Sequence, residues 1–153
     1  MYIETTIVIY LTARRSRELT KRANQQLTRQ WWRARRAQFD LYVSQPVVQE
    51  AADGDPNWAR RRLVSLKGIP ILESTPDAMR LAEALVGMSL PALPVADATH
   101  IAIATVHGMA YLVTWNPTLL LANAAMRSRI ESICRRVGFE PPILCTPGSL
   151  MED

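Results

Sequence analysis

Three acidic residues lie in or next to apolar stretches of the sequence: Glu4 in MYIETTIVIYL, Glu50 in VVQEA and Asp97 in VADATHIAIA. A buried carboxylate without a partner costs roughly several kcal/mol, so Glu4, whose neighbours are apolar residues or threonines, needs a partner. Oxygen ligands without a supporting cysteine or histidine cluster favour a hard cation such as Mg²⁺ or Mn²⁺. Acidic residues around such an ion are the usual means of hydrolysing phosphodiester bonds.

The elements that must position these acids are strands alternating with helices. The expected strands are MYIE, FDLYV, IPIL, AYLVTW and PPILC. Helices are expected over residues 6–11, 16–36, 46–54, 56–67, 76–86, 94–108 and 119–137, several of them opened by proline and closed by glycine. In the long helix, Ser16 is the expected N-cap, and four apolar residues recur every four positions: Leu19, Ala23, Leu27 and Trp31. The alternation predicts one α/β domain over residues 1–153 with a small, mostly parallel sheet.

In parallel α/β sheets, functional residues gather where strands end and the following helices begin. Glu4 ends the first expected strand, and Asn116 directly follows AYLVTW. Glu50 and Asp97 lie in the opening turns of two expected helices. These four residues are therefore expected on one edge of the sheet, as a candidate catalytic site. Three nearby threonines could hydrogen-bond the ligands or the waters of a bound metal: Thr5, Thr6 and Thr114.

Each of these residues also has a structural explanation. Glu50 and Asp97 could simply favour helix N-termini electrostatically, and Asn116 could begin a turn before a proline. His100 is expected to be a packed helix residue bonded to backbone, rather than a ligand or general base. His107 is expected to interact with a helix C-terminus. Trp31 and Trp32 are expected to be buried in the core or in an interface rather than stacked on bases. A solvated face is expected to hold Arg60, Arg61 and Arg62.

Positive charge is concentrated in one part of the chain. Nine of the eighteen basic residues fall between Arg14 and Arg36, where only Glu18 opposes them, and the formal net charge is +4. Such a stripe indicates a polyanion nearby, either nucleic acid or an acidic protein, although a solvated helical face would look the same.

Composition excludes several classes of protein. With 153 residues, 48% of them hydrophobic and 21% charged, the chain is long and apolar enough to fold as a globular domain. No window is apolar over the roughly 18 residues of a membrane span. The first residues lack a basic segment and contain Glu4, which argues against export and for a cytoplasmic protein. Cys134 and Cys145 are not spaced as metal ligands and are expected to be reduced thiols.

Four segments in this order, YIETTIVIYL, VVQEA, ADATHIAIA and LVTWN, resemble the PIN domain, and in particular the branch related to VapC-type toxins of bacterial toxin–antitoxin pairs. The resemblance implies a three-layer fold and an endoribonuclease that depends on Mg²⁺ or Mn²⁺. It also implies a dimer that an antitoxin protein neutralises. The products of such an enzyme would carry a 5′-phosphate and a 3′-hydroxyl.

The resemblance also implies a role for each candidate residue. Glu4, Glu50 and Asp97 match the three acids that hold the metal, and Asn116 falls where many members of the family carry a fourth acid. Glu4 is longer than the usual aspartate, and Asn116 is neutral. These two departures leave open a PIN-like module that no longer cuts and acts by binding RNA or a protein. The stripe would contact RNA phosphates, chiefly through Arg14, Arg15 and Arg17.

Overall fold

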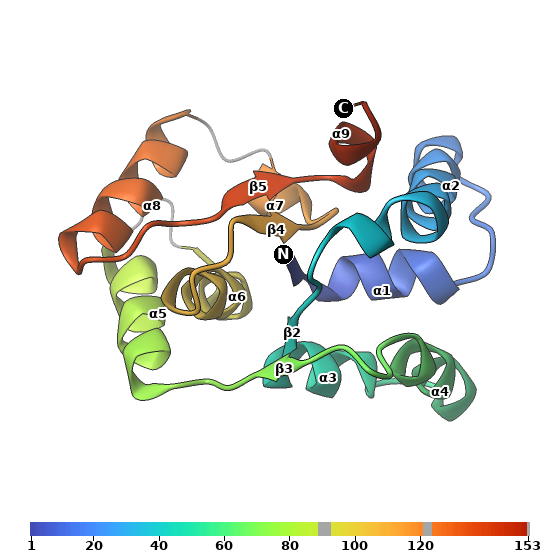
Figure 1. Cartoon of the computed structure of the whole chain (residues 1–153), viewed down its shortest axis with the longest axis horizontal. Helices are drawn as coiled ribbons and strands as arrows, with labels where there is room; N and C mark the ends of the chain where they lie inside the picture. The colour runs from blue at the N-terminus through green and yellow to red at the C-terminus, as the bar shows by residue number, and fades with distance from the viewer. Residues whose placement is uncertain (89–92, 121–123, 153) are drawn as a thin grey trace.

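The computed structural model of the chain describes residues 1–88, 93–120 and 124–152, and every strand pair in these ranges is parallel (Figure 1). One sheet has the order β1-β4-β5, and a second pairs β2 with β3. The strands are short: β1 Tyr2–Ile3, β2 Val43–Ser44, β3 Ile71–Leu72, β4 Tyr111–Val113 and β5 Ile143–Cys145.

The two groups of strands meet at an isolated bridge between Tyr2 and Tyr42. There the Ile3 amide donates to the Tyr42 carbonyl at 2.9 Å, and the Tyr42 amide donates to the Met1 carbonyl at 2.9 Å. The strands consequently follow one another in the order β3-β2-β1-β4-β5, with all their carboxyl ends on the same edge.

Helices lie on both sides of these strands (Figure 1). The group formed by α5, α6 and α8 packs on one side, and α1 to α4 with α9 pack on the other. This confirms the predicted α/β class, with a small parallel sheet flanked by helices. The bounds are α1 Thr5–Thr12, α2 Leu19–Ala34, the short 3₁₀ helix η1 Arg36–Gln38, α3 Gln45–Ala51, α4 Pro56–Ser65, α5 Pro76–Met88, α6 Val95–Val106, α7 Pro117–Leu120, α8 Ala124–Arg136 and α9 Pro147–Met151.

The core is built around the two central strands. Tyr2 and Ile3 of β1 and Leu112 and Val113 of β4 are all 0% exposed, and one hydrophobic cluster extends from Met1 to Leu150. Helix α6 crosses this core and is buried along most of its length. Glu4, which follows β1, and Asp97, in the first turn of α6, are therefore held by elements that pack in the core.

The prediction for α2 was wrong in its cap and in its buried side. The N-cap is Glu18, whose carboxylate accepts from the Thr20 amide, and not Ser16. Leu19 is 76% exposed and Ala23 is also exposed. The buried side of the helix consists instead of Gln25, Thr28 and Trp31.

Polar side chains of α2 face the neighbouring segment because they hydrogen-bond to its backbone. Gln25, which is 1% exposed, accepts from the Ser16 amide at 2.9 Å and donates to the Arg14 carbonyl at 3.0 Å. Arg29 donates to the carbonyls of Leu11 and Ala13. The segment between α1 and α2 forms neither a helix nor a strand, so side chains of α2 supply hydrogen-bond partners for its backbone groups.

The boundaries of the other helices differ less from the predicted ones. Gly68 and Gly108 adopt positive φ angles of 83° and 72° just after α4 and α6, as expected of glycines that end helices. The expected helix over 119–137 is present as α7 and α8, and residues 121–123 between them lie outside the described part of the chain. Helix α9 and η1 were not predicted. Within the described ranges, no helix combines the length and hydropathy required to cross a membrane.

Candidate active site

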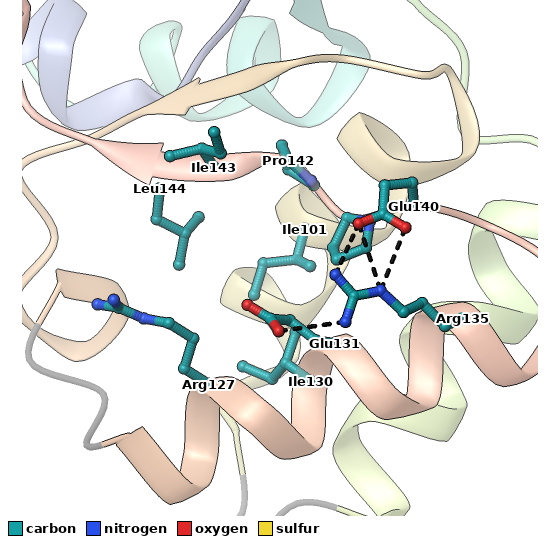
Figure 2. A pocket seen from close by; sticks show the side chains of 10 residues that line it. Ile101, Arg127, Ile130, Glu131, Arg135, Glu140, Pro142, Ile143 and Leu144 are labelled. Carbon is teal, nitrogen blue, oxygen red and sulfur yellow. Dashed lines mark hydrogen bonds and ion pairs between the residues drawn. The ribbon is translucent and has the colours of Figure 1, made fainter.

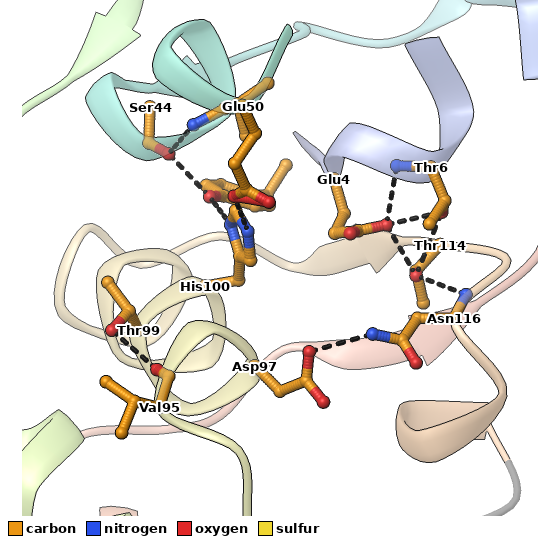
Figure 3. Close-up of polar contacts among 12 residues, drawn as sticks. Glu4, Thr6, Ser44, Glu50, Val95, Asp97, Thr99, His100, Thr114 and Asn116 are labelled. Carbon is orange, nitrogen blue, oxygen red and sulfur yellow. Dashed lines mark hydrogen bonds and ion pairs between the residues drawn. The ribbon is translucent and has the colours of Figure 1, made fainter. Parts of the chain in front are cut away.

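Glu4 lies at the junction of β1 and α1, where it is buried and hydrogen-bonded. Its side chain is the N-cap of α1, and one carboxylate oxygen, Oε2, accepts from the Thr6 amide at 3.0 Å and from Thr114 Oγ1 at 2.8 Å (Figure 3). The Thr6 hydroxyl donates to the same oxygen. Since Glu4 is only 4% exposed, these three donors supply the partner that its burial requires.

The two threonines also bind the loop that follows β4. Thr6 Oγ1 accepts from the Trp115 amide at 2.8 Å, and Thr114 Oγ1 accepts from the Asn116 amide at 2.9 Å. Each hydroxyl thus receives one backbone hydrogen bond and gives one to Glu4. Thr5 differs from expectation, because its buried hydroxyl has no hydrogen-bond partner among the described residues.

Asp97 is paired with Asn116 across the same edge. The amide nitrogen of Asn116 donates to Asp97 Oδ1 at 2.8 Å, and the amide oxygen accepts from the Thr118 backbone at 2.9 Å, which fixes the orientation of the amide. Burial raises the pKa of Asp97, the hydrogen bond from Asn116 opposes this, and the negative charge of Glu4 raises the pKa further. Asn116 therefore stabilises the ionised form of a buried acid.

Glu50 lies in the last turn of α3, which corrects the expectation that it lies in an opening turn. It is bonded to His100, which corrects the expectation that His100 bonds to backbone. His100 is 1% exposed, and its Nε2 lies 2.6 Å from Glu50 Oε1. Its Nδ1 lies 2.6 Å from the Tyr2 hydroxyl, which in turn lies 2.7 Å from Ser44 Oγ. Sequence patterns could not reveal these contacts, because the partners of His100 lie 50 and 98 positions away.

The structure brings the four expected site residues to one edge of the sheet. Figure 3 shows Glu4, Glu50 and Asp97 reaching the same region from the start of α1, the end of α3 and the start of α6, with Asn116 beside them after β4. The charges of Glu4 and Glu50 both raise the pKa of Asp97, which places the three acids in one electrostatic neighbourhood.

The donor chemistry at this edge fits a hard divalent cation, but the ligands do not close around one point. Within the described ranges, no group of three acidic, histidine or cysteine side chains is arranged to hold one metal ion. Glu4 and Asp97 each have one carboxylate oxygen engaged by neutral donors, whereas Glu50 is turned to His100. Glu4 and Asp97 are therefore the first candidates for a metal site.

The family follows from the sequence match over this same part of the chain. The PIN domain family matches residues 1–120, a range that includes all four site residues. This chain belongs to the PIN domain family.

Several solved structures share the fold of this PIN domain. VapC20 of Mycobacterium tuberculosis, a Sarcin-Ricin loop cleaving toxin, is 16% identical with a TM-score of 0.61, over 80% of this chain and 94% of that chain. A chain of FitAB bound to an IR36 DNA fragment is 13% identical with a TM-score of 0.59, over 95% and 94%. A chain of VapBC2 from Rickettsia felis, bound to a DNA fragment from their promoter, is 14% identical with a TM-score of 0.57, over 95% and 96%. No curated protein matches the sequence.

The expected RNA-binding arginines of this PIN domain lie away from the acids. Arg14, Arg15 and Arg17 are exposed on the segment after α1, whereas Glu4 caps the opposite end of that helix. Eight residues of helix span about 12 Å. A polar groove lies along this segment and α2, and it is lined by Arg15, Arg22, Gln25, Gln26, Arg29, Gln30 and Arg33.

A separate pocket of about 210 Å³ lies between α8 and the chain leading into β5 (Figure 2). Its floor is apolar and includes Ile101 and Ile130, and the charged Arg135 at its rim pairs with Glu140 at 2.7 Å and Glu131 at 3.4 Å. None of the expected site residues lines this pocket, so the acid edge and not this cavity is the candidate active site.

The residues that the sequence assigned to structure mostly have that role. His107 Nδ1 lies 2.9 Å from the Ile103 carbonyl at the end of α6, and Trp31 is fully buried. Trp32 is half-buried beneath the Arg36 guanidinium, 4.1 Å from the ring centroid. Arg62 corrects the expectation of a solvated face, because it donates to the backbone carbonyls of Ala51 and Asp53.

Proposed function

We propose that residues 1–153 form a single PIN-like domain that hydrolyses RNA phosphodiester bonds in the cytoplasm as an endoribonuclease dependent on Mg²⁺ or Mn²⁺. The observation that carries the proposal is the pair of buried carboxylates, Glu4 and Asp97, at the carboxyl edge of a parallel sheet. Their hydrogen-bond partners in the described part of the chain are neutral threonine, asparagine and backbone groups, and neither forms a salt bridge there. A divalent cation would balance this charge.

Each site residue has a distinct part in this proposal. Glu4 and Asp97 would hold the cation, and Glu50 would complete the acidic set from α3. Asn116 favours the ionised form of Asp97 by donating to Oδ1, and Thr6 and Thr114 orient the Glu4 carboxylate. The cation, when bound, supplies Lewis-acid chemistry at the scissile phosphate. No side-chain nucleophile is required, and the products would carry a 5′-phosphate and a 3′-hydroxyl.

The substrate would be positioned by the basic segment and not by the acids. Arg14, Arg15 and Arg17 are exposed, and the groove beside them has four arginines and no acidic residue among its lining. Contacts from guanidinium groups to phosphates fix the position of a nucleic acid without reading its sequence.

The cellular role would be that of the toxin of a type II toxin–antitoxin pair. Two proteins that share the fold, FitAB and VapBC2, were solved bound to DNA, and VapC20 is a Sarcin-Ricin loop cleaving toxin. We accordingly expect a homodimer that a separate antitoxin protein neutralises.

The deciding experiment measures cleavage of mixed cellular RNA by the purified protein in Mn²⁺, in Mg²⁺ and in a chelator. We expect cleavage that requires the metal and is lost in Glu4→Gln. Glu83→Gln, which changes an exposed glutamate of α5, is the matched control and should cut normally. Cleavage by Glu4→Gln at the wild-type rate would refute the proposed role of Glu4.

The alternative is a PIN-like module that binds RNA or a protein without cutting. It is favoured by the neutral Asn116 and by Glu50, which has one carboxylate oxygen hydrogen-bonded to His100. Retention of RNA in Mn²⁺ with no cleavage, by a folded wild-type protein, would select this alternative.

A further inference from the structure

A buried chain of hydrogen bonds ends on the Glu50 carboxylate. It begins at the N-terminus of α3, where the Val47 amide donates to Ser44 Oγ at 3.3 Å. It continues through the Tyr2 hydroxyl to His100 and reaches Glu50 Oε1. Ser44, Tyr2 and His100 are each at most 1% exposed, so water does not compete for the bonds among these three residues. The Glu50 side chain is 39% exposed and ends the chain at the surface.

Counting the available hydrogens shows in which direction each hydrogen bond of this series is donated. Ser44 Oγ already accepts a backbone hydrogen, and its own hydroxyl hydrogen can go to the Tyr2 oxygen. Burial raises the pKa of Tyr2, which keeps the phenol protonated and able to donate to His100 Nδ1. Nε2 then carries the imidazole hydrogen and donates it to Glu50.

The opposite arrangement leaves groups unsatisfied. If Nδ1 of His100 carried the hydrogen, the phenol of Tyr2 would have to donate to Ser44. The Ser44 hydroxyl hydrogen would then have no acceptor among the described residues. In the neutral form, the bare Nε2 would also face the Glu50 carboxylate at 2.6 Å, which places two acceptors against each other.

We propose that His100 is a positioning residue, held by Tyr2 in the tautomer that carries its hydrogen on Nε2, and that it orients Glu50 at the acid edge. This inference deepens the proposed function and rests on it only for its catalytic consequence. His100 holds Oε1, and Oε2 of Glu50 has no hydrogen-bond partner within the described ranges. The second oxygen is thereby left available toward Glu4 and Asp97.

The first test needs neither metal nor substrate. The chain has two histidines, so nitrogen NMR of the full-length, metal-free protein, with His107→Gln for assignment, reports on His100 directly. We expect a protonated Nε2 with a slowly exchanging hydrogen and an unprotonated Nδ1 near neutral pH. In Tyr2→Phe, His100 should populate both tautomers, with the hydrogen on Nδ1 or on Nε2. A hydrogen on Nδ1, or averaging of both forms in the wild type, would overturn the proposal.

The second test uses two variants that each keep one nitrogen position. The side-chain amide of His100→Gln reaches about where Nε2 lies, whereas that of His100→Asn reaches only about as far as Nδ1. We expect kcat to fall by roughly tenfold or more in His100→Asn with KM little changed, and to be largely retained in His100→Gln. Equal losses in both variants, or no loss in His100→Asn, would contradict positioning through Nε2.

The two tests separate this proposal from the proposed function. If the wild type does not cut RNA, the nuclease assignment fails, but the NMR result still decides which nitrogen of His100 carries the hydrogen. If the wild type cuts and the hydrogen lies on Nδ1, the nuclease stands and the role of His100 is wrong.

Discussion

At the scale of single residues, Thr114 connects the parts of the acid edge. Its hydroxyl donates to Glu4 and accepts from the Asn116 amide, so it links the carboxylate on β1 to the residue that pairs with Asp97. It is 0% exposed, and water cannot replace it in either bond. The position of Asn116 after β4 is therefore tied to Glu4 through this one hydroxyl group.

Replacing Thr114 by valine should destabilise the fold while conserving the shape of the side chain. A buried carboxylate loses a donor and a backbone amide loses its acceptor, which together cost about 1–3 kcal/mol in the free energy of unfolding. Urea denaturation measures the change, and Thr114→Ser, which retains the hydroxyl, is the control. Similar losses of stability in the valine and serine variants would show that the effect comes from packing and not from hydrogen bonding.

Asp97→Asn should abolish cleavage and stabilise the metal-free fold. The pKa of Asp97 is raised above its ordinary value of 3.8 by burial, and the folded chain therefore holds this proton more tightly than the unfolded chain. The wild type loses stability as the pH rises from about that ordinary value through the folded pKa, and Asp97→Asn is spared this loss. The advantage of the variant is thus expected near neutral pH and absent in acid.

Urea denaturation in chelator, from about pH 3 to about pH 7, measures this difference between wild type and variant. A stability difference that does not change with pH would contradict the raised pKa. A folded Asp97→Asn protein that still cuts RNA at the wild-type rate would remove Asp97 from the mechanism.

At the scale of elements, periodicity predicted where helices and strands lie better than which side of a helix is buried. The alternation of strands and helices was readable from apolar runs and glycines, and the strand-end position of Glu4 followed from it. The buried side of α2 was not readable. Gln25 faces inward because it hydrogen-bonds to the backbone of a neighbouring segment, as the half-buried Arg29 also does. This is a tertiary requirement that helical spacing does not encode.

The same limit applies to the acid edge. Glu4 and Asn116 could be placed there because each lies just after the carboxyl end of a strand. Glu50 near the end of α3 and Asp97 at the start of α6, which follows α5, depend on how these helices pack against the sheet. The pairing of His100 with Glu50 could not be predicted, because it joins α6 to α3. The Thr5 hydroxyl, which has no hydrogen-bond partner in the part of the chain that the structure describes, was equally unpredictable, since the sequence made it equivalent to Thr6.

The groove beside α2 should contribute to RNA affinity through charge. Arg22 and Arg29 also bind backbone carbonyls, whereas Arg15 and Arg33 have no hydrogen bond or ion pair within the described ranges. In a Glu4→Gln background, which prevents cleavage, replacing both Arg15 and Arg33 by alanine should weaken RNA binding. The slope of log affinity against log salt should fall by about 0.7 for each phosphate that the variant no longer neutralises.

The matched control removes the same charge elsewhere, by replacing Arg60 of α4 and Arg136 of α8, which are both exposed. Fluorescence anisotropy over a series of salt concentrations measures both pairs. Equal effects of the two double variants would indicate a response to net charge and not to the groove.

At the scale of the whole molecule, the packing around β1 and β4 ties the acid edge to the global stability of the fold. Leu112 lies in the central strand and is 0% exposed, whereas Ile143 of the edge strand β5 is 63% exposed. The two positions lie on neighbouring, hydrogen-bonded strands, where Tyr111 pairs with Ile143 and Leu112 with Leu144. Substitutions at Leu112 and Ile143 therefore separate the effect of core packing on stability from the effect of changing a strand residue.

Leu112→Ala should lower the free energy of unfolding by about 2–5 kcal/mol, because the core cannot fully collapse around the smaller side chain. Ile143→Ala is the control and should change it by less than about 1 kcal/mol. Urea unfolding followed by tryptophan fluorescence and far-ultraviolet circular dichroism should show one coincident transition in each case. Two separate transitions would contradict a single domain over residues 1–153.

The position of Glu4 as the N-cap of α1 has a consequence for how such proteins diverge. A lineage that lost the need for cleavage would still keep a carboxylate here, because removing it leaves the start of α1 and the hydroxyl groups of Thr6 and Thr114 without their acceptor. Retention of this acid among descendants would thus record selection for folding as much as selection for activity. Asp97 and Glu50, which cap no helix, would be the first to drift and the better markers of a working enzyme.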